Sequence, residues 1–250
     1  MNGKVVIVTG GAGGIGAEVC KAFASQGVMV AVADMDEARA ESVAAEVTKA
    51  GAEALGVEMD VADENSVKSA VNRTVERFGR VDFLVHCAGN NVKSPLLDMT
   101  LEQWRSSLDT HLTGAFLACR EAGRQMVKQG HGGRVVLMSS VAAMSPVPDR
   151  GAYSPAKAGL SNMARLLSLE WAQYNINVNA IAPGVFETPM NTKLINQPER
   201  KQKILSRTPM GRFGNVEEIQ GAAIFLASES SNFVTGEVLA VDGGFLAVGI

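Results

Sequence analysis

Short apolar runs alternate with longer segments of mixed polarity along nearly the whole chain. The first two runs, 5–8 and 28–33, are rich in valine and are typical of strands buried on both faces of a sheet. Further runs lie near 54–59, 81–86, 133–139, 177–182 and 237–241, and helical spacing fills the segments between them. Strict alternation predicts a doubly wound α/β fold in one domain, 1–250, with a parallel sheet of about seven strands and helices on both faces.

Two details mark where these elements begin and where the alternation stops. Thr100-x-x-Gln103 and Asn215-x-x-Glu218 have the spacing of capping boxes, which open helices. At about 186–213 prolines stand among polar residues and the alternation is interrupted. Because ligands bind at the carboxyl ends of parallel strands, this region is predicted to be a lid over a substrate, with a solvated insertion as the alternative.

A glycine-rich loop joins the first predicted strand to the first predicted helix. It contains Gly10, Gly14 and Gly16, and the apolar run after that helix closes on Asp34. Glycines here let the backbone approach a pyrophosphate, which the positive end of the helix stabilises. A carboxylate at Asp34 accepts hydrogen bonds from the adenosine ribose and repels a 2′-phosphate. With no arginine or lysine in 9–16 or directly after Asp34, the pattern predicts NAD rather than NADP; a turn without a ligand is the alternative.

Tyr153 and Lys157 carry the second candidate chemistry. At i and i+4 of a helix, the phenol and the ammonium lie on one face. Proline is tolerated in the first turn of a helix, so Pro155 predicts a helix that begins close to Tyr153. The nearby cation and the positive end of the helix both favour the phenolate, which suits proton transfer. An amphipathic helix with a surface lysine is the alternative.

With both motifs in view, the chain resembles the short-chain dehydrogenase/reductase family across essentially its whole length. The motifs follow the family's order: Thr9-Gly10-x-x-x-Gly14-x-Gly16, Asp60-Val61, Ala88-Gly89, Ser140, Tyr153-x-x-x-Lys157, Pro183-Gly184 with Thr188 beyond, and Val241-Asp242-Gly243-Gly244. The resemblance implies a Rossmann fold and an NAD-dependent alcohol dehydrogenase or ketoreductase.

Site roles follow from the chemistry and from this resemblance. Tyr153 acts as the base in oxidation and the acid in reduction, Lys157 binds the ribose, and Ser140 donates to the substrate oxygen, with Ser139 as the alternative donor. The resemblance implies that Asp60 meets the adenine amino group and that 183–188 wraps the carboxamide. The predicted cofactor-binding residues are Gly10, Gly14, Ile15, Gly16, Asp34, Asp60, Val61, Cys87, Ala88, Gly89, Tyr153, Lys157, Pro183, Gly184, Phe186 and Thr188.

The chain departs from the family pattern at two places. His111 stands where the family has an asparagine that holds a relay water. It can also hold a water, and its titration near neutrality is expected to add a pH dependence; a packed helix histidine is the alternative. His86-Cys87 replaces Asn-Asn. Cys87 is expected to give backbone to the adenosine pocket, and His86 to tighten the sheet.

The residues that should line the substrate pocket form no recognisable motif. Predicted contacts are Lys93, Ser140, Arg150 and Met190. The two cations among them suit a carboxylate, a sulfonate or a polyol, with solvated surface charges as the alternative. We expect a small polar or sugar-acid-like secondary alcohol or ketone. A 3-oxoacyl-carrier-protein reductase is an alternative that Asp34 opposes, because such enzymes usually use NADPH. A non-catalytic NAD-binding module is another, opposed by the intact set of candidate catalytic residues.

Composition narrows the remaining classes. The formal charge of −3 and the lack of basic runs give no sign of nucleic-acid binding. Three cysteines without CxxC spacing, no signal peptide and no long apolar span predict a cytoplasmic protein without a membrane segment. No metal is expected. The resemblance implies a homotetramer that packs through helices near 101–129 and 152–175, with the apolar tail 245–250 covered at another contact.

Overall fold

The computed structural model describes residues 1–188, 191 and 196–248. Within these ranges seven parallel strands form one sheet in the order β3-β2-β1-β4-β5-β6-β7. The strands are β1 (Val5–Thr9), β2 (Met29–Asp34), β3 (Ala54–Glu58), β4 (Phe83–His86), β5 (Gly133–Met138), β6 (Ile176–Pro183) and β7 (Val238–Val241). Every predicted strand is present, and the doubly wound α/β architecture is confirmed.

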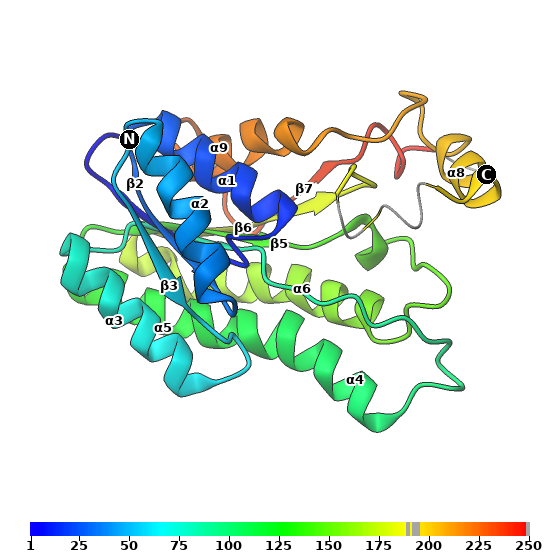
Figure 1. Ribbon diagram of the computed structural model, residues 1–250, viewed down its shortest axis with the longest axis horizontal. Helices are drawn as coiled ribbons and strands as arrows, with labels where there is room; N and C mark the ends of the chain where they lie inside the picture. Colours follow the sequence, from blue (N-terminus) through cyan, green and yellow to red (C-terminus); the bar gives the residue numbers. More distant parts are fainter. Residues whose placement is uncertain (189–190, 192–195, 249–250) are drawn as a thin grey trace.

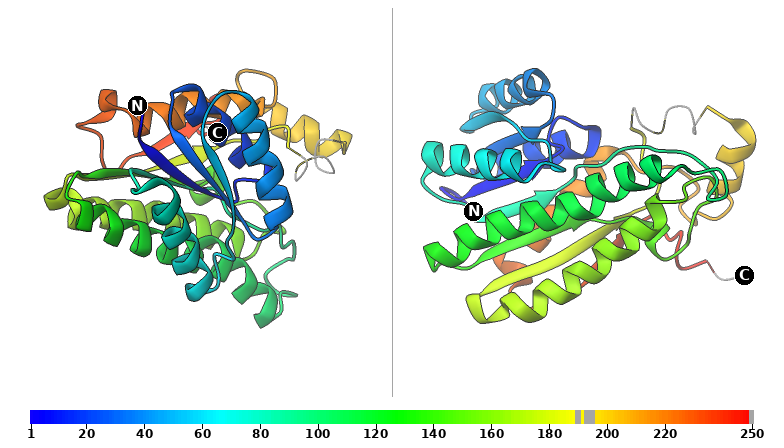
Figure 2. Two further views of the ribbon diagram at one scale, coloured as in Figure 1. Left: turned by 60° about the vertical axis from the view of Figure 1, so that its left-hand side comes forward. Right: turned by 90° about the horizontal axis from the view of Figure 1, so that it is seen from below.

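Helices cover both faces of the sheet (Figure 1). One face packs against α1 (Gly14–Ser25), α2 (Glu37–Lys49) and α9 (Gln220–Ala227). The other face packs against α3 (Glu64–Phe78), α5 (Gly114–Gln129) and α6 (Tyr153–Trp171). Both layers of helices and the sheet between them are also visible from the side (Figure 2). All five residues of β1 are buried, as expected for a strand covered on both faces.

The long helix expected near 101–129 is interrupted by a wider turn. It runs as α4 (Leu101–Leu108), a π-helical segment η1 (Asp109–Thr113) and α5. The predicted capping box opens it: Gln103 N donates to Thr100 Oγ1 at 3.2 Å, and Thr100 N donates to Gln103 Oε1 at 3.0 Å. The second predicted box opens a 3-10 turn, Val216–Ile219, which leads into α9.

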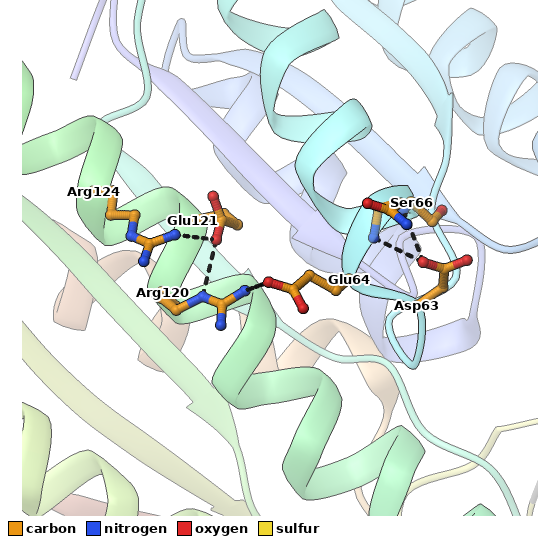
Figure 3. A network of polar contacts seen from close by, with 7 residues as sticks. Asp63, Glu64, Ser66, Arg120, Glu121 and Arg124 are labelled. Atoms are coloured by element: carbon orange, nitrogen blue, oxygen red, sulfur yellow. Dashed lines mark hydrogen bonds and ion pairs between the residues drawn. The ribbon is translucent and has the colours of Figure 1, made fainter.

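An ionic network joins α5 to α3 (Figure 3). Arg120 pairs with Glu64 of α3 and with Glu121 of its own helix, the second at 2.9 Å. Arg124 also pairs with Glu121 at 2.9 Å. Because Glu121 is largely buried and lies between two guanidinium groups, this network fixes the relative position of the two helices more firmly than an isolated exposed pair would.

In the described part of the region predicted as a lid lies the helix α8 (Pro198–Leu205), which projects beyond the end of the sheet (Figure 1). The predicted substrate contact Met190 lies outside the described residues. The tail packs back on this region, since the Arg207 guanidinium carbon lies 4.6 Å from the ring centre of Phe245. Among the described residues, no helix has both the length and the apolar character that a membrane crossing requires.

Candidate active site

The glycine-rich loop lies at the carboxyl end of β1, the strand between β2 and β4. Gly10 has a φ of 62°, and a Cβ there would lie 2.7 Å from the Cα of Ala88. A Cβ on Gly16 would lie 2.1 Å from the carbonyl oxygen of Gly10. α1 begins at Gly14 without a side-chain cap. The N–H groups of this first turn, which includes Ile15, are therefore available to an anion.

Asp34, which is predicted to meet the adenosine ribose, lies at the end of β2. Its carboxylate accepts hydrogen bonds from Ala12 N at 3.1 Å and Asp36 N at 3.2 Å. Arg39 of α2 donates to the carbonyl oxygen of the same Ala12 at 2.7 Å. The sequence pattern missed Arg39 because only the turn into α2 returns it to the loop. The helix that carries Arg39 is capped by Asp36, whose Oδ1 accepts from Arg39 N at 3.1 Å. An aspartate in an N-cap position three residues before Arg39 is the sequence feature that could have indicated this turn.

The other predicted adenosine contacts follow β3 and β4. Cys87 N donates to the carbonyl oxygen of Thr9 at 3.0 Å, which holds the segment after β4 against the glycine-rich loop. Burial raises the pKa of the Cys87 thiol to about 12, so it stays protonated. Asp60 is exposed after β3, and its carboxylate accepts from Ala62 N at 2.9 Å. Val61 beside it is buried. These residues all follow the carboxyl ends of strands of the same parallel sheet.

Tyr153 and Lys157 lie in the first turns of α6, which begins at Tyr153 as predicted. The Lys157 Nζ lies 5.7 Å from the centre of the Tyr153 ring and donates to the carbonyl oxygen of Met138 at 2.6 Å. Lys157 is only 4% exposed. Burial lowers its pKa to about 8 because it disfavours the charged form. At neutral pH the ammonium is therefore still charged beside the tyrosine.

The two serines after β5 have different surroundings. Ser139 Oγ donates to the carbonyl oxygen of Lys157 at 3.0 Å and shares a 2.7 Å hydrogen bond with Ser161. Ser140 Oγ accepts from Ala142 N at 3.1 Å. The Ser139 hydroxyl is thus engaged in joining β5 to α6, whereas the proton of the Ser140 hydroxyl remains available. This geometry favours Ser140 over Ser139 as the donor to a substrate.

His111 lies within the π-helical segment, and its ring meets that of Tyr153 edge to face at 5.2 Å. Its Nε2 donates to the carbonyl oxygen of Asn90 at 3.0 Å, which makes Nδ1 the acceptor of a neutral ring. Nδ1 is buried and accepts no hydrogen bond from the described residues. Burial, with Lys157 nearby, lowers the pKa of His111 to about 2. The expectation that it titrates near neutrality is therefore wrong.

His86 has the structural place predicted for it. It is fully buried at the end of β4, and its Nδ1 forms a 2.9 Å hydrogen bond with Thr9 Oγ1 of the neighbouring strand. Burial lowers its pKa to about 3, so it is neutral.

A Cβ on Gly89, three residues after His86, would lie 2.5 Å from the His111 ring. Only glycine at this position leaves room for that ring.

The segment after β6 closes the crevice on the far side. Pro183 ends β6, and Gly184 N donates to the carbonyl oxygen of Val241 at 2.9 Å. Phe186 is buried and forms an isolated bridge with Gly214. Thr188 is the last residue before the first gap in the described ranges. The predicted carboxamide segment therefore starts at the carboxyl edge of the sheet, beside the other site residues.

The predicted substrate contacts are only partly brought together. The Arg150 guanidinium carbon lies 5.3 Å from the centre of the Tyr153 ring. A single 3-10 turn, Val141–Ala143, separates Ser140 from the loop that carries Arg150. Lys93 is exposed. Met190 lies outside the described residues. Arg150 is thus the predicted cation that reaches the candidate catalytic tyrosine.

The residues present fit a nicotinamide dinucleotide. The first turn of α1 offers N–H groups for a pyrophosphate, and Asp34 offers a carboxylate for ribose hydroxyls. The Lys157 ammonium has three N–H bonds, and Met138 takes one of them. The remaining donors can bind a second ribose next to Tyr153. Together these groups allow cofactor binding at one end of the crevice and proton transfer at the other.

Comparison with known proteins agrees with this geometry. The family described as "Enoyl-(Acyl carrier protein) reductase" matches residues 10–246. The chain is 36% identical over 245 residues to the D-threitol dehydrogenase of Mycolicibacterium smegmatis, with 98% of this chain and 94% of that protein covered.

Two solved structures have nearly the same fold. A gluconate 5-dehydrogenase from Burkholderia cenocepacia, in complex with NADP and tartrate, matches with a TM-score of 0.96, 32% identity and coverage of 100% of this chain and 97% of that one. An NAD+-bound xylitol dehydrogenase matches with a TM-score of 0.92, 32% identity and coverage of 97% and 99%.

Proposed function

Because the chain belongs to the short-chain dehydrogenase/reductase family of oxidoreductases, we propose that it transfers a hydride between NAD(H) and a small polar secondary alcohol or its ketone. The observation that carries the proposal is the buried Lys157 ammonium beside Tyr153, at the crevice that the glycine-rich loop opens. Bound there, the nicotinamide supplies or accepts the hydride. The protein's own task is to orient the substrate and move a proton.

Each side chain has one part in that task. The Tyr153 hydroxyl takes the substrate's hydroxyl proton in oxidation and returns it in reduction. Ser140 donates a hydrogen bond to the same substrate oxygen, where negative charge develops. Lys157 places a positive charge beside the tyrosine ring and binds the ribose. These roles agree with the distances that place Lys157 against Tyr153 and leave the Ser140 proton unused.

His111 has a different part from the one its sequence position suggests. As a neutral ring with a free Nδ1 acceptor, it can hold a water next to the tyrosine without changing charge. The π-helical turn supports this proposal, because such turns are frequently found at functional sites. His111 therefore positions the proton path and is not a titrating group of it.

The class of substrate is inferred from the substrates for which the relatives are named. Relatives named for D-threitol, xylitol and gluconate act on small polyols or sugar acids, and the same class is proposed here. A 3-oxoacyl-carrier-protein reductase is the second candidate, since the matched family's description names an acyl carrier protein. Asp34 speaks against it, because the carboxylate disfavours NADPH. Turnover of an acyl-carrier-protein thioester in preference to every polyol would favour that candidate.

The proposal predicts turnover of a panel of sugar alcohols and sugar acids with NAD and NADP in parallel, followed by the absorbance of the reduced cofactor. We expect a higher kcat/KM with NAD, because a 2′-phosphate would face the Asp34 carboxylate. Asp34→Ser should raise kcat/KM for NADP about tenfold or more by removing that charge. NADH binding without turnover of any alcohol would instead indicate a non-catalytic module.

Arg39 provides the control for this experiment. It already reaches the Ala12 carbonyl beside Asp34, so it is placed to meet a 2′-phosphate once the carboxylate is removed. Adding Arg39→Gln to Asp34→Ser should therefore cancel most of the gain with NADP and leave NAD kinetics nearly unchanged. Equal efficiency of the wild type with both cofactors would overturn the NAD preference.

We also propose a homotetramer in the cytoplasm. The outer face of α5 and α6 exposes Phe116 by 47%, Leu166 by 52% and Leu169 by 81%, and it carries a groove of about 470 Å³. Exposed apolar side chains on one pair of helices, with an open groove beside them, support an interface at this face. The three cysteines are unpaired, which suits a reducing compartment. Light scattering should give about four times 26.3 kDa, and Phe116→Glu should give a smaller species; a wild-type monomer would contradict the proposal.

A further inference from the structure

An unpaired cation lies beside the candidate catalytic tyrosine. The Arg150 guanidinium carbon is 5.3 Å from the centre of the Tyr153 ring, and the side chain is partly buried. Within the described part of the chain no carboxylate pairs with Arg150. Its neighbour Asp149 pairs instead with Arg200 of α8 at 3.2 Å. A partly buried guanidinium without a counter-ion is costly unless an anion meets it in the working protein.

The backbone holds Arg150 in place between two loops. Ser94 N donates to the carbonyl oxygen of Asp149 at 3.1 Å, and Gly151 N donates to the carbonyl oxygen of Ser94 at 3.2 Å. Asp149 has a φ of 61°, the left-handed conformation that few residues other than glycine adopt. Strained residues of this kind cluster at functional sites, where the surrounding structure fixes them. The position of Arg150 is therefore set by tertiary contacts and not by a flexible loop.

Arg150 also lines a pocket of about 460 Å³, whose lining includes Ser154 beside Tyr153 in the sequence but neither Tyr153 nor Ser140. The walls are largely apolar, with Leu96, Pro146 and Val147 among them. Its polar wall residues include Asp149, whose carboxylate is paired with Arg200, and Ser154, which is 8% exposed and whose Oγ has no hydrogen-bond partner in the described ranges. A fixed guanidinium and an unpartnered hydroxyl in a largely apolar pocket form a donor set suited to a carboxylate.

We propose that Arg150, with Ser154, binds a carboxylate of the substrate, so that the substrate is a small hydroxy acid of the sugar-acid type and not a neutral polyol. This inference rests on the proposed dehydrogenase function. The carbinol group then faces Tyr153 and Ser140 while the acid group lies toward the loop that carries Arg150. The pocket volume falls within the range of about 300–1,000 Å³ that small-molecule sites occupy.

The test compares a six-carbon sugar acid, gluconate, with its neutral counterpart sorbitol. We expect the wild type to prefer gluconate. Arg150→Gln should raise KM for gluconate about 10- to 100-fold, since it removes charged hydrogen bonds, and should change kcat and the kinetics with sorbitol little. Ser154→Ala should raise KM for gluconate several-fold. Arg105→Gln, which removes an exposed cation from α4, is the matched control and should change neither substrate.

Binding without turnover separates this inference from the proposed function. Calorimetric titration of gluconate into the NADH-saturated protein should give heat for the wild type and much weaker binding for Arg150→Gln. Equal binding to both proteins, or no binding of gluconate to the wild type, would overturn the carboxylate site. A fall in kcat that is the same for both substrates would also overturn it, by showing that Arg150 acts on Tyr153. Gluconate binding that depends on Arg150 without turnover of any alcohol would count against the proposed reaction alone.

Discussion

Replacing Tyr153 by phenylalanine should lower kcat by about 10²- to 10⁴-fold or more, the range that general acid–base catalysis contributes. The substitution removes the hydroxyl that exchanges the proton and retains the ring. The contacts of that ring with His111, Arg150 and Lys157 all involve its face or edge. Cofactor affinity depends on the glycine-rich loop, Asp34 and Lys157, so NADH should bind nearly as well as before.

The chain offers a matched control, because it has only two tyrosines. Tyr174 is 44% exposed in the turn after α6, away from the crevice, and Tyr174→Phe should leave both kcat and NADH binding unchanged. Cofactor fluorescence measures the binding, and circular dichroism checks the fold. If the Tyr153→Phe protein keeps more than a tenth of the wild-type kcat, the proton does not pass through this hydroxyl.

The inner strands β1, β2, β4, β5 and β6 could be read from the sequence because most of their residues are buried, whereas the edge strands β3 and β7 are mostly half-buried. β1, β2 and β5 are nearly continuous valine-rich or aliphatic runs, and their observed limits differ from the expected ones by a residue or so. The start of α6 was also predictable, since Pro155 can stand only in a first helical turn. The π-helical turn in the helix of His111 was not, because an extra residue in one turn leaves no change in composition or periodicity.

The site was predictable where neighbours in sequence are neighbours in space. Tyr153 and Lys157 lie four residues apart on one helix, and the glycine-rich loop is a single turn. The protonation state of His111 was not predictable, because it depends on burial and on the distant Lys157. The roles of Arg39 and Arg150 likewise depend on the loops that return them to the crevice. Sequence reasoning therefore placed the candidate catalytic groups better than it described their electrostatic surroundings.

The second large effect concerns Lys157. Lys157→Met should lower kcat about 10²-fold or more, because it removes the positive charge beside the tyrosine that transfers the proton. Unlike Tyr153→Phe, it should also weaken NADH binding by about tenfold or more, since it removes charged hydrogen bonds to the ribose. Kinetics and cofactor fluorescence on the two variants measure this contrast. A Lys157→Met protein that binds NADH as tightly as the wild type would show that the ammonium does not contact the ribose.

The same substitution should change how stability depends on pH. Burial lowers the pKa of Lys157 from 10.5 to about 8, so between those values the unfolded chain binds more protons than the folded one. The free energy of unfolding of the wild type should therefore rise with pH in this window, and the Lys157→Met variant lacks that contribution. The stability of the variant relative to the wild type should fall by on the order of 3 kcal/mol across the window.

Denaturant unfolding of both proteins without cofactor, from pH 7 to pH 10.5, measures this difference. Other groups that titrate at alkaline pH are present in both proteins, so their contributions cancel in the comparison. Omitting the cofactor matters, because a ligand that binds only the folded wild type would stabilise it by mass action. Parallel stability curves would mean that burial does not lower the pKa of Lys157. A fall in the stability of Lys157→Met relative to the wild type as the pH rises would mean that burial of the Lys157 ammonium costs stability at neutral pH. The protein would then keep a destabilising cation at the position where proton transfer needs its charge.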